Sequence, residues 1–480
     1  MRIRFTIPTL LLAMSVAIGA QAPDRARPPV PGPAPVLTLP RIQKQQLSNG
    51  LPVWVVEQHE VPVAQVNLVV LSGSADDPAG KYGIASLTAA MLMEGAGSRS
   101  SLELADAVDF LGADLTAASG SDSAAIRLHA PVARLADALP LMADVAQRPL
   151  FAQPDLDRLR QQRLTSILQG RDDANTIASL AYARVLFGPT HRFGTATMGT
   201  AQTLRSFTTA DLKAFYQAAY RPDNAAIIVV GDVTPASVGP LLEQHFGAWK
   251  PAPGAGIARV RQPAPPPRTR REVYLVDKPD APQTQIRIGR VGVPRSTPDF
   301  FPIEVLNTIF GGSFSSRLNL NLREEHGYTY GAGSYFDMRK EAGPFLAYAG
   351  VQTDKTAESL KEFFVEFAAI QQPVPADELA RAKSYVALGL PSGFETTGDI
   401  SRRLEESLVY SLPDDFYARY VPNIEAVSAA DVQRAARTYL TADRMAVVVV
   451  GDRKTIEPAI ASLTLGPLKV LTIDEVFGSN

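Results

Sequence analysis

The feature that most constrains this chain of 480 residues is an internal duplication. The segment FTTADLKAFYQAAYRPDNAAIIVVGD (207–232) aligns without a gap to VSAADVQRAARTYLTADRMAVVVVGD (427–452), and eight of the 26 aligned pairs are identical. The same offset of 220 residues relates VWVVEQ (53–58) to VYLVDK (273–278) near the start of each half. A register shared at both ends of so long a unit indicates two homologous halves.

Both halves show the same order of expected elements. Each begins with two β-branched strands, at 53–57 and 64–71 and again at 273–277 and 284–290. Helical patterns follow at 83–93, 102–111 and 154–170, and in the second half at 299–310, 316–325 and 376–390. A continuous β-branched run ending in Gly-Asp closes each half. The prediction is an α+β fold whose two homologous halves each cover a mostly antiparallel sheet with helices and form a clam shell around a cavity.

Proline-rich stretches delimit the expected domains. Segments 23–41 and 251–270 are too rich in proline to fill a sheet or a helix, so they are interpreted as extended, flexible connections. They separate an N-terminal domain at 42–250 from a C-terminal domain at 271–470.

The first 20 residues have the pattern of a secretory signal peptide. Arg2 and Arg4 precede an apolar run, and the small residues Gly19, Ala20 and Ala22 place the expected cleavage between 19 and 22. The alternative is an uncleaved membrane anchor. No later stretch is long enough to span a bilayer, so the mature protein is predicted to be exported and soluble, in the periplasm of a Gram-negative source.

Composition excludes several functions. A formal net charge of −2 gives no electrostatic basis for binding nucleic acid. With no cysteine, the chain has no disulfide, thiolate zinc site or cysteine nucleophile. No two of the five histidines lie within four residues, so neither HExxH nor HxxEH occurs, and GxSxG and Walker A motifs are also absent. A dispersed Ser-His-Asp set stays open.

The densest polar and aromatic stretch is NLNLREEHGYTYGAGSYFDMRK (319–340). Its alternation predicts that the phenols of Tyr328 and Tyr330 share one face of an extended segment. Arg323 and Tyr330 together would form a donor pair suited to a peptide carbonyl or a developing oxyanion. In the other interpretation, Arg323 pairs with a nearby glutamate and the tyrosines fill a sheet face. His326 is expected at the surface or at a strand edge.

Two further stretches bear on a site. FGGSFSS (310–316) contains Gly311, Gly312 and Ser313, which either cradle an anion or an approaching peptide backbone, or form a helix C-cap and loop. YGIASLTAAMLMEGAGS (82–98) predicts a helix with an apolar stripe. The neighbouring face of that helix carries only small side chains that neither bind a metal nor transfer a proton: Ser86, Ala89 and Ala90.

These features together resemble the insulinase/pitrilysin-type zinc metallopeptidases, in particular short two-domain exported bacterial members that are similar to mitochondrial processing peptidase subunits. The resemblance rests on LNLREEHGYTYGAGSYF, the preceding FGGSFSSRL, the duplicated halves and the terminal VVVVGD, and it covers about residues 42–470. It implies that Arg323 and Tyr330 bind substrate from the second half. It further implies substrate contacts in the Gly-rich loop and the adjacent strand: Gly311, Gly312, Ser313 and Tyr328.

The N-terminal half departs from the family pattern. GIASLTAAM aligns with the family's G-x-A-H-x-x-E-H-M, so the metal-binding histidines fall on Ser86 and Ala90 and the general base falls on Ala89. The family's third ligand, a glutamate, is expected near 165–170, yet the chain has no glutamate between Glu103 and Glu243. The resemblance therefore implies a chain without zinc that is not catalytic alone.

The primary hypothesis is the zinc-free subunit of an exported heterodimeric metallopeptidase. A paralogue with HxxEH would supply zinc and base, and Arg323 and Tyr330 would act on extended peptide substrates at the partner's active site. The alternative is a non-catalytic scaffold or peptide-binding protein, as in the core subunits of the respiratory bc complex. A third possibility is a hydrolase with an unrelated site.

Overall fold

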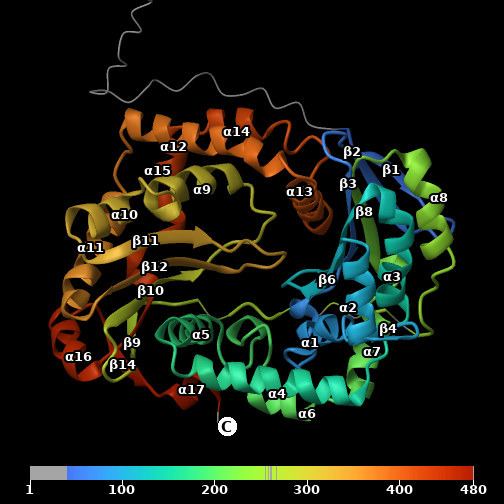
Figure 1. The fold of residues 1–480 in the computed structure, drawn as a ribbon. Coiled ribbons are helices and arrows are strands. Elements are labelled where there is room, and N and C mark those ends of the chain that lie inside the picture. Colours follow the sequence, from blue (N-terminus) through green and yellow to red (C-terminus); the bar gives the residue numbers. More distant parts are fainter. Residues whose placement is uncertain (1–40, 255, 258, 260–261, 266, 479–480) are drawn as a thin grey trace, which may run out of the picture. The chain divides into compact units, whose positions relative to one another are not determined.

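The computed structural model describes residues 41–478, except 255, 258, 260, 261 and 266. The described residues belong to one compact unit (Figure 1). The predicted signal peptide at 1–20 and the first proline-rich segment up to residue 40 lie outside the described residues.

Two six-stranded mixed sheets form the framework of the molecule. The strands of the first sheet are, in spatial order, β1 (Gln43–Gln46), β2 (Pro52–Glu57), β8 (Ala225–Gly231), β3 (Val63–Val70), β7 (Ala124–Pro131) and β6 (Asp114–Ser119). Those of the second are β11 (Thr329–Phe336), β12 (Pro344–Gln352), β10 (Gln283–Val291), β13 (Ala446–Gly451), β9 (Glu272–Asp277) and β14 (Leu468–Leu471). A two-stranded hairpin, β4 (Gly95–Ala96) and β5 (Arg99–Ser100), lies outside both.

The strand registers repeat between the two sheets. Val53 pairs with Ile227 in the parallel β2–β8 pair, and Val273 pairs with Val447 in β9–β13, at the same offset of 220 residues. The sheets differ at one edge, where β1 is antiparallel to β2 but β14 is parallel to β9. The two homologous halves and the mostly antiparallel sheets are confirmed.

Helices follow the predicted segments closely. Those of the first half are α1 (Ile84–Met91), α2 (Ser101–Phe110), α3 (Leu135–Gln147), α4 (Gln153–Gly170), α5 (Ala174–Phe187), α6 (Ala201–Ser206), α7 (Thr209–Ala219) and α8 (Pro235–Phe246). Those that follow are α9 (Phe300–Asn307), α10 (Arg317–Asn319), α11 (Thr356–Ala369), α12 (Ala376–Gly389), α13 (Thr397–Tyr410), α14 (Tyr420–Ala426), α15 (Ala429–Tyr439), α16 (Arg453–Ser462) and α17 (Ile473–Phe477). Within the described residues, none combines the length and apolarity that a membrane crossing requires.

Local capping explains why equivalent helices start at equivalent positions. The hydroxyls of Thr208 and Ser428 accept from the backbone N–H groups of Asp211 and Asp431, whose carboxylates bind back to the caps. Each is a complete capping box, which satisfies two otherwise unpaired N–H donors at the start of α7 and of α15. The duplicated sequence therefore repeats the start signal as well as the strand pattern.

The two halves exchange a helix with each other. Helix α5 of the first half packs on β13 and β10 of the second sheet, and α13 of the second half packs on β8 and β3 of the first (Figure 1). The hydroxyl of Tyr182 on α5 donates to the carbonyl of Phe345 on β12. One face of each sheet packs against the helix from the other half, and the opposite face packs against the hydrophobic core of its own half. The central strands are therefore buried on both faces, which accounts for their unbroken β-branched runs.

The second proline-rich segment, 251–270, contains no helix or strand among its described residues, as expected. It is nevertheless tied to the rest of the molecule. Ile257 N donates to Ala218 O at 2.9 Å, and Pro263 O lies 3.1 Å from His191 Nε2. The connection is extended, and hydrogen bonds hold it against the first half of the chain.

Candidate functional site

The helix that aligns with the family's metal-binding motif is anchored by a buried ion pair. The Asp77 carboxylate accepts from the N–H groups of Gly83 (2.7 Å) and Ala85 (2.9 Å) at the start of α1, and it lies 2.9 Å from Arg192 Nε. Both charged side chains are almost fully buried. Burial raises the pKa of Asp77 and the Arg192 guanidinium opposes that shift. The pair fixes where α1 begins.

The predicted small face of α1 meets a positive charge. Ser86 and Ala90 are half-buried and Ala89 is buried, and only the Ser86 hydroxyl has any polarity. Arg163 of α4 donates from Nη2 to the Ser86 backbone oxygen at 2.9 Å. Its Nη1 atom is buried and has no hydrogen-bond partner in the described part of the chain. Burial lowers the pKa of Arg163 to about 10.

These residues do not fit a zinc ion. Zinc sites in proteins use imidazole, thiolate or carboxylate ligands, and this face offers one hydroxyl beside a guanidinium. Across the described residues, no cluster of three or more His, Asp or Glu side chains is arranged to hold a metal. Arg163 was missed by sequence reasoning. Its only signal was its place on the long helix, shortly before the 165–170 window expected to carry the third ligand.

In the second half, the Gly-rich segment (310–316) begins within one π-helical turn and is followed by a second. These turns are η5 (Thr308–Gly312) and η6 (Leu320–Glu325), and π-turns are frequent at functional sites. A Cβ on Gly311 would lie 2.5 Å from Ser334 N of β11, so this glycine permits close packing of the turn on the strand. Gly312 is exposed and Ser313 is half-buried. Gly311 thus has a packing role, and Gly312 and Ser313 are reachable.

Arg323 lies at the end of this segment and is partly exposed. Its guanidinium stacks over the Phe314 ring at 4.7 Å and forms an ion pair with Glu324 at 3.3 Å. Such exposed pairs contribute little stability, because water solvates both charges. The pairing with a glutamate is therefore present, but it leaves the guanidinium accessible to another acceptor.

Tyr330 and Tyr328 occupy different environments. Tyr330 is 89% exposed, and its hydroxyl makes no hydrogen bond with a described residue. Tyr328 packs on the second core and stacks on His326, with 5.0 Å between ring centroids. A register shift between Thr329 and Ala332 separates them, so the prediction that the two phenols share one face is wrong. His326 lies at the surface, as predicted.

Asn319 holds the Gly-rich segment against β11 and was missed at the sequence level. Its Nδ2 donates to Phe314 O at 2.7 Å, and its Oδ1 accepts from Ala332 N at 3.3 Å. The polar side chain therefore fixes the loop relative to the strand that carries Tyr330. No hydrogen bond or ion pair between described residues joins this segment to the small face of α1.

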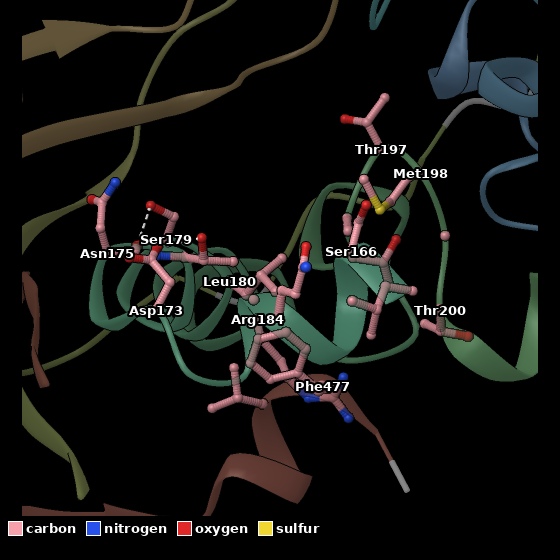
Figure 2. A pocket seen from close by; sticks show the side chains of 18 of the residues that line it. Ser166, Asp173, Asn175, Ser179, Leu180, Arg184, Thr197, Met198, Thr200 and Phe477 are labelled. Atoms are coloured by element: carbon pink, nitrogen blue, oxygen red, sulfur yellow. Dashed lines mark hydrogen bonds between the residues drawn. The ribbon is translucent and has the colours of Figure 1, made fainter. Parts of the chain in front are cut away.

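A separate cavity of about 580 Å³ lies beside α4 and α5 (Figure 2). Its walls come from the end of α4, one side of α5, residues 194–200 and α17. None of the predicted site residues lines it. Sequence reasoning gave no signal for this cavity, because its walls come from segments far apart in the chain.

Two models of one protein family match this chain, one mainly in the first half and the other mainly in the second. Residues 53–182 match the family model described as insulinase (peptidase family M16), and residues 206–386 match the one described as the peptidase M16 inactive domain. An uncharacterized zinc protease of Mycobacterium leprae is 27% identical over 367 residues, which cover 75% of this chain and 81% of that protein.

Solved structures show the same fold. The peptidase M16 inactive domain from Pseudomonas fluorescens superposes with a TM-score of 0.78 and 28% identity, over 85% of this chain and 98% of that one. The periplasmic protease PqqL from Escherichia coli gives a TM-score of 0.70 at 16% identity, over 90% of this chain and 51% of that one. At 16% identity the second match concerns the fold alone.

Proposed function

Because this chain belongs to the insulinase family (peptidase family M16) and its α1 face lacks every metal ligand, we propose that it is the zinc-free subunit of an exported heterodimeric peptidase. One observation carries the proposal. The metal position of the first half is replaced by small residues and a guanidinium, while the second half presents Arg323 and Tyr330 to solvent. Both donors are therefore reachable by a substrate bound outside this chain.

In this proposal, the chain contributes hydrogen-bond donors to a reaction at the partner's active site. The partner, a relative with HxxEH, holds zinc and the general base. Arg323 and Tyr330 donate to the scissile carbonyl oxygen and stabilise the negative charge that develops on it in the tetrahedral intermediate. The cation and the phenol are suited to this because neither is committed to a buried partner.

The substrate is an extended peptide or an unfolded segment. Strand β11 lies at the edge of the second sheet, where Asn319 and the Gly-rich segment cover Ala332–Ser334, and Tyr330 and Gly331 at its start are exposed and not paired with another described strand on one side. An extended peptide adds to such an edge through main-chain hydrogen bonds. Tyr330 and the exposed Tyr335 lie on this strand, beside the path that the peptide would follow.

The proposed location is the periplasm. The N-terminal pattern of residues 1–22 supports export, and the structurally similar PqqL is described as periplasmic. Expression with the natural N-terminus, followed by fractionation and N-terminal sequencing, should find a mature chain that starts after residue 19, 20, 21 or 22. A chain retained uncleaved in the membrane would contradict this part of the proposal.

The test of the function is reconstitution with an HxxEH-bearing relative from the same genome. We expect a complex on gel filtration, zinc bound in the complex but not in this chain alone, and cleavage of a quenched fluorescent peptide by the complex only. Full activity of the relative alone, or no complex, would refute the proposal. If the complex keeps its activity after substitution of both Arg323 and Tyr330, the scaffold alternative is favoured.

A further inference from the structure

The cavity beside α4 and α5 combines apolar walls with hydrogen-bond donors. Ile167, Leu180, Val476 and Phe477 contribute apolar surface, and residues 194–200 form a loop along one side (Figure 2). Its volume of about 580 Å³ lies within the usual range for small-ligand sites.

Buried Arg192 organises that loop. Its guanidinium donates to three successive backbone oxygens: those of Thr195 (3.3 Å), Ala196 (3.2 Å) and Thr197 (3.2 Å). Arg192 is itself held by Asp77, so the oxygens converge on a fixed charge. These three carbonyls therefore point toward the buried Arg192.

The corresponding N–H groups point the other way. In a planar trans peptide the C=O of one residue is antiparallel to the N–H of the next, so these three carbonyls direct the N–H groups of Ala196, Thr197 and Met198 away from Arg192. None of the three donates to a described atom, and all three residues line the cavity. Successive backbone N–H groups of this kind form an anion-binding concavity.

A positive side chain adds to the same cavity. Arg184 lines it next to Phe477, and in Figure 2 Thr197 and Met198 lie toward its other side. Arg184 makes no hydrogen bond or salt bridge with a described residue; burial lowers its pKa, and the nearby Glu475 carboxylate opposes that shift. The acid on the wall, Asp173, is already bound to the Thr176 N–H and hydroxyl at 2.7 and 2.6 Å. The cavity thus has donors for an anion and apolar space beside them.

We propose that this cavity binds the C-terminal end of a peptide whose last side chain is apolar. The carboxylate accepts from the N–H groups of Ala196, Thr197 and Met198, Arg184 on the opposite wall makes the cavity more positive, and the side chain enters the apolar part. Backbone N–H arrays capture peptide carboxylates in this way. The inference goes beyond the proposed function and uses neither Arg323 nor Tyr330.

The test is direct binding of a dansylated tetrapeptide ending in phenylalanine, measured by fluorescence anisotropy with the full chain. The free acid should bind about tenfold or more tightly than its C-terminal amide, because the amide loses the charge-assisted hydrogen bonds. Equal binding of acid and amide would overturn the proposal. Dodecanoate should compete weakly, and binding of dodecanoate as tight as that of the peptide would reassign the site to acyl chains.

Variants locate the binding to this cavity. Arg184→Gln should weaken binding of the free-acid peptide by about tenfold. Ser179→Trp should block the cavity, because Ser179 lines it from an exposed helical position. Arg437→Gln is the matched control, an exposed arginine on α15. Arg323→Ala should bind like the wild type, so failure of this inference is distinguishable from failure of the proposed function. Unchanged binding by folded Ser179→Trp would contradict the assignment.

Discussion

Two arginines beside α1 differ in how fully their guanidinium groups are paired. Arg192 is paired with Asp77 and with three loop carbonyls, whereas Arg163 makes one bond to Ser86 O and leaves Nη1 buried without a partner. A buried ion pair with satisfied donors is costly to break from one side, because the remaining charge stays buried. An unpaired half-buried guanidinium carries a desolvation cost that a neutral side chain does not.

We therefore expect unequal effects of the same substitution. Arg192→Met should lower the free energy of unfolding by ~3–5 kcal/mol, since it leaves the Asp77 carboxylate buried without its positive partner. Arg163→Met should change it by less than ~1 kcal/mol or raise it, since a neutral side chain of similar length removes an unpaired charge. Urea unfolding monitored by circular dichroism measures both. Equal losses would contradict this view of Arg163.

Glu304 of α9 is the titrating group with the clearest consequence for stability. Although the residue as a whole is half-buried, its carboxyl is enclosed, and burial raises its pKa from 4.5 to about 7. Arg295 opposes this shift and Glu406 adds to it. Because the folded pKa exceeds the unfolded one, the native state holds the proton more tightly. The resulting stabilisation is complete below about pH 4.5 and is lost as the pH rises to about 7.

Glu304→Gln should remove this pH dependence. The wild type should lose up to ~3 kcal/mol of stability from this group between pH 4.5 and pH 8, and the variant should show a correspondingly flatter profile. Urea midpoints at a series of pH values measure the difference. Parallel profiles of the two proteins would show that another group titrates over this range.

At the scale of the element, α1 retains the position of a metal-binding helix without its chemistry. Restoring the motif with Ser86→His, Ala89→Glu and Ala90→His supplies two ligands and a base but no third ligand on α4. Since Arg163 stays against the same helix, we expect no stoichiometric zinc and no peptidase activity from the triple variant. Zinc analysis of the purified protein checks this. One tightly bound zinc per chain would show that the site is less remodelled than we infer.

The sequence predicted individual helices and strands better than the way in which they pack on one another. Strand and helix bounds followed from apolar periodicity, because it is a property of short segments, and the offset of 220 residues indicated two homologous halves, whose strand registers the structure shows to repeat. The exchange of α5 and α13 between the sheets was not predicted, since a periodic pattern identifies an apolar face but not what covers it. The two π-turns and the strand irregularity near Tyr330 also escaped, because single-residue insertions leave no periodic signal.

At the scale of the whole molecule, the two halves of the duplicated fold differ in the side chains that they present. The first half keeps the framework of the metal helix and fills the metal position with Ser86, Ala89 and Ala90 beside a guanidinium. The second half presents exposed donors next to a sheet edge. The residue types on both surfaces followed from the sequence, and their roles in a site stay a prediction. The cavity that we assign to peptide carboxylates was not predicted, because it depends on the carbonyl directions set by Arg192.

The most direct measurement is kcat of the reconstituted complex carrying Arg323→Ala or Tyr330→Phe in this chain, with exposed Arg437→Ala as the matched control. Each donor variant should lower kcat by ~10²-fold or more, as loss of one oxyanion donor does, while the complex assembles with unchanged zinc content. A wild-type kcat in both variants, with the complex intact, would contradict the claim that this chain completes its partner's active site.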